Sequence, residues 1–111
     1  MIGVTIDPAT FADLQATTGA EFVIELVDTF AEEAPQMLSE MRAAHAAAAA
    51  ERFRRAAHSL KSNSSTFGAV RLAEMARALE LGGLPGSSAP LEAVAAELDG
   101  TLAALKALAR G

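Results

Sequence analysis

The residue of this chain best suited to chemistry is His58, which stands among small and polar residues and is followed three positions later by Lys61. On a helix with about 100° per residue, His58 points away from a regularly spaced apolar stripe formed by Phe53, Ala57, Leu60, Ser64 and Phe67. The stripe is the expected buried face, so we expect the imidazole to be exposed. An exposed imidazole in this setting is typical of a histidine that is phosphorylated.

The helical neighbours of His58 are basic residues and small hydroxyl residues. Because positions three and four apart lie side by side on a helix, the side chains expected around His58 are Arg54, Arg55, Lys61, Ser62 and Ser65. A phosphoryl group on an imidazole carries about two negative charges, which cationic side chains stabilise through charge-assisted hydrogen bonds. Ser62 is small enough to leave the ring open to a second protein.

Length and charge restrict the classes of function. A chain of 111 residues predicts one domain spanning residues 1–111, and its alanine-rich, weakly aromatic composition favours packed helices. The net charge of −5 argues against nucleic-acid binding, which requires a basic surface. Residues 52–77 nevertheless carry about +5, since Glu74 is the only acidic residue among them. This basic region around His58 predicts an acidic site on the partner.

No feature of the sequence indicates export or membrane insertion. The chain has no cysteine, and residues 1–7 lack the basic region, apolar segment and cleavage site of a leader. No stretch approaches the roughly 18 apolar residues of a membrane span. We therefore expect a cytoplasmic protein that does not bind membranes.

Apolar periodicity and turn residues predict five helices. The first follows Asp7-Pro8 and ends near Gly19, the second runs from about residue 20 to 46 with a kink near Pro35, and the third covers about 51–67. The fourth begins at residue 69 or 70, and the fifth follows the Gly-rich loop at 82–88. These elements predict an all-α fold, an antiparallel up-down four-helix bundle with a short additional N-terminal helix across one end.

The chain resembles histidine-containing phosphotransfer (HPt) domains. The matching residues are His58, Leu60, Lys61, Ser64, Gly68 and Ala69, preceded by Arg54, Arg55, Ala56 and Ala57. Residues 30–38 are also similar to the second helix of that family. The resemblance implies that His58 accepts phosphate and Lys61 supports it, with Ser62 where the family usually has glycine. It also implies a hydrogen-bonding side chain on the following helix, for which Arg77 and Glu80 are the candidates.

Membership of that family would imply a phosphocarrier. His58 would carry a phosphoryl group between aspartates of receiver domains, belonging to hybrid histidine kinases and response regulators, and the protein would act as a monomer. The chain has no glycine-rich nucleotide loop, so we expect no ATP-binding or kinase site of its own. We likewise expect no cofactor of its own, with Mg²⁺ bound by the partner receiver.

Three alternatives remain open to different degrees. The chain could be the phosphoacceptor module of a chemotaxis-type histidine kinase, or an adaptor that sequesters a receiver without transferring phosphate. A metal-binding bundle is disfavoured because the chain has two histidines and one of them, His58, points outward. The other, His45, lies at the edge of an apolar face, and we interpret it as structural.

Overall fold

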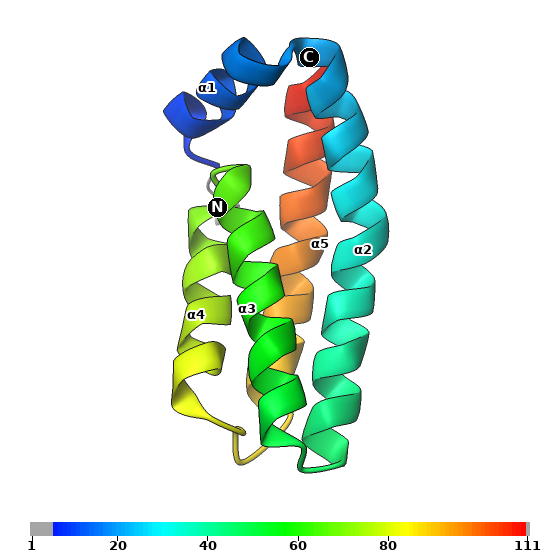
Figure 1. Cartoon of the computed structure of the whole chain (residues 1–111), viewed down its shortest axis with the longest axis vertical. Helices are drawn as coiled ribbons and strands as arrows, with labels where there is room; N and C mark the ends of the chain where they lie inside the picture. Colours follow the sequence, from blue (N-terminus) through cyan, green and yellow to red (C-terminus); the bar gives the residue numbers. More distant parts are fainter. Residues whose placement is uncertain (1–5, 111) are drawn as a thin grey trace.

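The computed structural model describes residues 6–110, and these residues form five α-helices (Figure 1). Four of them lie side by side along the length of the molecule, and the short first helix lies across one end (Figure 1). The helices are α1 (Pro8–Thr18), α2 (Ala20–Ala46), α3 (Ala50–Thr66), α4 (Val70–Gly82) and α5 (Ala89–Arg110). The five predicted helices are confirmed to within a residue or two. Residues 1–5, which belong to the segment predicted to lack the features of a leader, lie outside the described residues.

The helix ends follow the signals seen in the sequence. The Asp7 carboxylate accepts a hydrogen bond from the backbone N–H of Thr10 at 3.2 Å, and Pro8 occupies the first position of α1, where a missing N–H costs nothing. α2 continues without a break through Pro35, whose side chain is exposed. This long, uninterrupted helix gives α3 a partner along its whole length.

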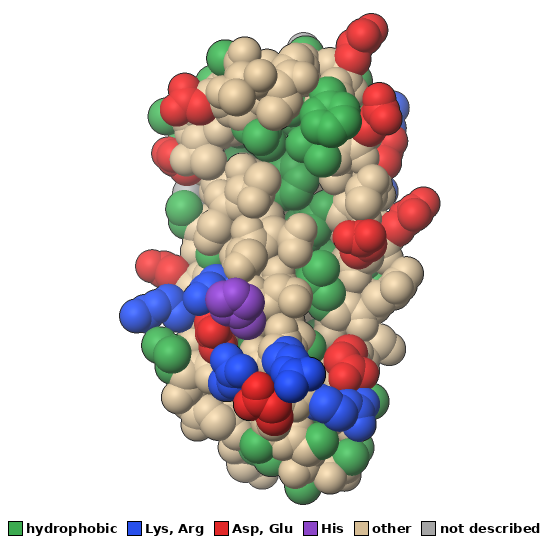
Figure 2. All heavy atoms as spheres, in the orientation of Figure 1, with side chains coloured by type: hydrophobic (Ala, Val, Ile, Leu, Met, Phe, Trp, Pro, Cys, Tyr) green, Lys and Arg blue, Asp and Glu red, His purple; other side chains and the backbone are tan. Residues whose placement is uncertain are grey.

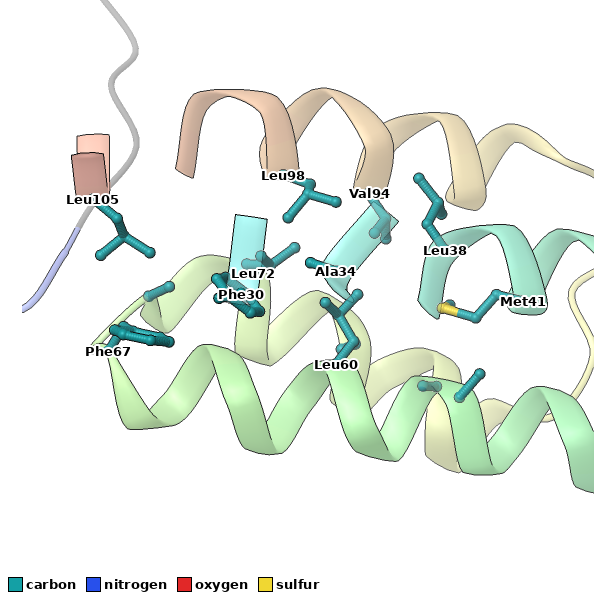
Figure 3. Close-up of a cluster of buried hydrophobic side chains, with 14 of the residues drawn as sticks. Phe30, Ala34, Leu38, Met41, Leu60, Phe67, Leu72, Val94, Leu98 and Leu105 are labelled. Carbon is teal, nitrogen blue, oxygen red and sulfur yellow. The ribbon is translucent and has the colours of Figure 1, made fainter. Parts of the chain in front are cut away.

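The apolar stripe of α3 packs into a core to which all five helices contribute. Leu60 is fully buried, and the Phe67 ring lies 5.2 Å from the Phe30 ring of α2. Side chains from α2, α4 and α5 also face this core, as Figure 3 shows for Ala34, Leu38, Met41, Leu72, Val94, Leu98 and Leu105. Burial of the stripe fixes the rotation of α3 about its axis and so turns the opposite face, with His58, outward.

Gly68 joins the end of α3 to the N-terminal segment. Its φ of +77° lies in the left-handed region, as predicted for a residue that closes a helix. The backbone N–H of Asp7 donates to the Gly68 carbonyl at 2.8 Å. A Cβ atom at position 68 would lie 3.0 Å from both the Asp7 carbonyl oxygen and the Thr10 Cβ atom. Only glycine fits both the backbone conformation and this close approach.

We expect Gly68→Ala to lower the free energy of unfolding by about 2 kcal/mol, because alanine meets left-handed strain and steric overlap together. Urea denaturation followed by circular dichroism measures this loss. Gly82→Ala is the matched control, since Gly82 is helical and a Cβ atom there meets no atom within 4 Å. Equal stabilities of the two variants would contradict the assigned role of Gly68.

Within residues 6–110, no helix combines the length and apolar character needed to cross a membrane. The same part of the chain contains no group of three or more His, Cys, Asp or Glu side chains placed to hold a metal ion.

Candidate functional site

His58 projects from the middle of α3, and 53% of its side chain is exposed. The predicted exposure of this imidazole is confirmed. Its neighbours on the other side of the helix, Ala57 and Leu60, are fully buried. A ring carried by a packed helix keeps a reproducible position, which a reaction with a second protein requires.

One carboxylate from α4 joins the two residues that the sequence singled out. Glu80 Oε2 lies 2.8 Å from Nδ1 of His58, and Glu80 Oε1 lies 2.8 Å from Nζ of Lys61. Only 11% of the Glu80 side chain and 28% of the Lys61 side chain are exposed, so the carboxylate is largely shielded beneath the imidazole. Of the two candidates on the following helix, Glu80 is the one that reaches the histidine.

The charge on Glu80 determines which ring nitrogen keeps its lone pair when His58 is neutral. The pKa of Glu80 lies below its ordinary value because Lys61, and after it His58, bond to the carboxylate. An ionised carboxylate can only accept a hydrogen bond, so in a neutral imidazole the proton is on Nδ1. Nε2 then has the free lone pair and is the nucleophilic nitrogen.

A hollow of about 330 Å³ lies beside the imidazole, lined by Arg54, Arg55, His58, Ser59 and Glu80. Both arginines are paired with a carboxylate on their own helix. Their Nε atoms lie 3.0 Å and 3.3 Å from the carboxylate oxygens of Glu51, at the start of α3. These bonds, that of Arg54 first, lower the pKa of Glu51 to about 2. The arginines expected around His58 therefore already have an anionic partner.

The local charge is accordingly smaller than the sequence count indicated. Extending the counted segment to residues 51–80 adds Glu51 and Glu80, and the net charge of the segment becomes about +3. Figure 2 shows the outcome on one face of the molecule, where basic side chains gather around a histidine with acidic side chains interspersed among them. The surface is a paired cluster of charges rather than a uniformly basic patch.

Three of the predicted site residues have no polar contact with the imidazole. Ser62 and Ser65 are exposed on α3, and Arg77 is exposed on α4, one turn before Glu80. Among the described residues, no hydrogen bond or ion pair links any of the three to His58. They lie where an approaching protein could touch them.

Two residues at the site were missed by the sequence reasoning, namely Glu51 and Ser59. The signal for Glu51 was present, because it precedes Arg54 by three positions and Arg55 by four, the spacings at which opposite charges pair on a helix. His45 is confirmed as structural, since it is half-buried and its Nε2 lies 2.9 Å from the carbonyl oxygen of Pro85.

A second hollow, of about 450 Å³, runs between α2 and α3 next to the first. Met37 and Ala56 supply apolar surface, and Arg55 and Ser59 line both hollows. On its rim, Arg52 of α3 bonds Glu40 of α2 through two contacts of 2.9 Å and 3.0 Å. His58 thus lies beside an indented surface that has both apolar and charged groups, a composition suited to contact with another protein.

The fold and site together define a helical protein that presents one supported, solvent-facing histidine. The sequence matches the family model described as the Hpt domain over residues 25–108, and the chain belongs to that family. Among solved structures it is similar to histidine-containing phosphotransfer protein B (HptB) from Pseudomonas aeruginosa PAO1, with 30% sequence identity and a TM-score of 0.73. That match covers 95% of this chain and 90% of the other. No curated protein matches the sequence.

Proposed function

We propose that this protein carries a phosphoryl group on His58 between aspartates of receiver domains in a phosphorelay. Membership of the Hpt family supports histidine phosphotransfer as the general function. The observation that carries the specific proposal is the contact of 2.8 Å between His58 Nδ1 and the shielded Glu80 carboxylate, which leaves Nε2 as the nucleophile. The exposure of the ring supports an in-line approach by a partner.

The proposed reaction is a displacement at phosphorus. Nε2 of His58 forms a bond to the phosphorus of an aspartyl phosphate, and the phosphorus–oxygen bond to the aspartate breaks, so that the aspartate leaves as a carboxylate. Nδ1 keeps its proton, which it shares with Glu80, and transfer to the next receiver is the reverse step. Lys61 supplies positive charge beside the phosphoryl oxygens. Mg²⁺ belongs to the receiver in this scheme.

The same proposal covers the organisation of the protein. Residues 1–111 form one domain, with α2 to α5 as an antiparallel up-down four-helix bundle and α1 as the additional helix. The receivers of hybrid histidine kinases and response regulators dock over His58 and the indented surface between α2 and α3. The protein acts as a cytoplasmic monomer with no cofactor and no ATP-binding site of its own.

The direct test is to follow labelled phosphate onto the purified protein from two sources. One source is a set of phosphorylated receiver domains from its own organism, and the other is a chemotaxis-type kinase with ATP. Labelling of His58 by a receiver, followed by loss of the label to a second receiver, is the expected result. Labelling by the kinase alone would instead establish a kinase phosphoacceptor module. Receiver binding without any labelling would establish a sequestering adaptor.

Lys61→Ala should slow phosphoryl transfer by roughly tenfold, because it removes a cation from the charge developing on the phosphoryl oxygens. The fold should persist, since a partly exposed ion pair adds little to stability. Quenched-flow labelling gives the rate, and thermal melting checks the fold. Lys106→Ala on α5 is the control, because it removes an exposed lysine on another helix. Equal rates in the two variants would assign Lys61 no role in transfer.

A further inference from the structure

Arg54 and Arg55 lie midway between an acidic residue and the proposed phosphoacceptor. Glu51 precedes them by three and four positions, and His58 follows them by four and three positions. On α3 these are the spacings of adjacent surface neighbours in both directions along the axis. Each arginine can therefore meet Glu51 or a group on His58 by turning its side chain, with no movement of the backbone.

In the structure both guanidinium groups bond to Glu51. Arg54 forms two contacts with its carboxylate, Nε to Oε1 at 3.0 Å and Nη2 to Oε2 at 2.5 Å, and Arg55 adds a third from Nε to Oε2 at 3.3 Å. The same two arginines line the hollow beside the imidazole. Glu51 raises the pKa of Arg54 most strongly, and the charge of Glu80 raises it further, which places the Arg54 guanidinium within electrostatic range of the site.

A phosphoryl group in the hollow would be a stronger acceptor than Glu51. It carries about two negative charges and three acceptor oxygens, whereas the one carboxylate divides a single charge between two guanidinium groups. Arg52 offers a contrast within the same helix, because it bonds Glu40 of α2 and does not line the hollow beside His58. Arg54 and Arg55 are thus the guanidinium groups placed for an exchange of partners.

We propose that Glu51 is a positioning residue that holds Arg54 and Arg55 away from His58 in the resting protein and yields a guanidinium group to the phosphoryl group on His58. The inference rests on the proposed function and deepens it. In this exchange Glu51 and the phosphoryl group compete for the same guanidinium groups. Glu51 thereby weakens the phosphorylated state, which helps a carrier to pass its phosphate onward.

The competition can be measured without a partner protein. Phosphoramidate phosphorylates histidine directly: Nε2 bonds to phosphorus while the phosphorus–nitrogen bond breaks and ammonia leaves. We expect Glu51→Gln to raise the rate of His58 labelling roughly two- to fivefold, the range corresponding to an exposed ion pair. Glu25→Gln, which removes the same charge from an exposed position on α2, should leave the rate unchanged.

A double-mutant comparison establishes whether the effect passes through the arginines. In an Arg54→Gln/Arg55→Gln background, Glu51→Gln should no longer change the labelling rate, and circular dichroism should show the helices intact in every variant. A rate for Glu51→Gln equal to that of the wild type, or an increase that persists without the arginines, would overturn the inference.

Nuclear magnetic resonance of the arginine Nε–H groups gives a second readout that a purely structural role of Glu51 would not move. Phosphorylation of His58 should shift the Arg54 or Arg55 signal and leave the Arg52 signal in place. If the Arg54 and Arg55 signals do not shift in a protein phosphorylated on His58, the exchange of partners is rejected and the proposed function is not affected. Failure of His58 to accept phosphate in any variant, from phosphoramidate or from receivers, would reject the proposed function as well.

Discussion

We expect replacement of His58 with glutamine to reduce phosphoryl uptake to the background level of a reaction that contains no phosphotransfer protein. Glutamine is close to histidine in size and polarity, but its amide nitrogen has no available lone pair to attack phosphorus. Because 53% of the His58 side chain is exposed, we expect the substitution to disturb little packing. Labelling from a phosphorylated receiver, read by intact mass or by radioactivity, measures the loss.

The control for this prediction is His45→Gln, which alters the other histidine of the chain. His45 bonds the Pro85 carbonyl oxygen and lies against Phe53, with ring centroids 6.3 Å apart, so its replacement affects stability and not phosphate uptake. Receiver affinity should be nearly unchanged in His58→Gln, because the indented surface between α2 and α3 is intact. Retained labelling in His58→Gln would place the acceptor elsewhere and eliminate the proposed mechanism.

The exposure of His58 could be predicted because it depends on one short-range pattern. Phe53, Ala57, Leu60, Ser64 and Phe67 recur at helical spacing, and all five are buried. Their burial determines which face of α3 points outward, whatever the remaining helices do. Two helix ends could be predicted for the same reason, because Asp7-Pro8 and Gly68 act on the backbone next to them.

The choice between Arg77 and Glu80 as the partner of His58 could not be predicted, because it depends on how two helices pack together. Arg77 and Glu80 are one turn apart on α4, and the choice between them depends on how far α4 slides along α3. That register is set by the packing of Leu72, Ala76 and Leu79 against the core, which no pattern within α4 reveals. The pairing of Glu51, by contrast, is predictable from the sequence, because Glu51 precedes Arg54 by three positions and Arg55 by four.

Glu80→Gln should slow phosphoryl uptake by His58 by at least about tenfold. When Nε2 bonds to phosphorus while Nδ1 keeps its proton, the ring gains positive charge, which the Glu80 carboxylate stabilises at 2.8 Å. A glutamine has no charge to offer. Its NH₂ group can also donate to Nδ1, which would favour the tautomer with the proton on Nε2 and block the nucleophile.

Removal of Glu80 also has an opposing effect, because Lys61 loses its anionic partner and becomes free to approach the phosphoryl group. The two effects separate in a Lys61→Ala background, where only the loss of support for the ring remains, so the rate penalty of Glu80→Gln should be larger there.

Nitrogen-15 chemical shifts of the ring report the tautomer directly and should show more proton on Nε2 in Glu80→Gln. Glu74→Gln, an exposed change on the same helix, should alter neither the rate nor these shifts. An unchanged tautomer together with an unchanged rate in Glu80→Gln would mean that the carboxylate only anchors Lys61, and that Nε2 is selected by the receiver.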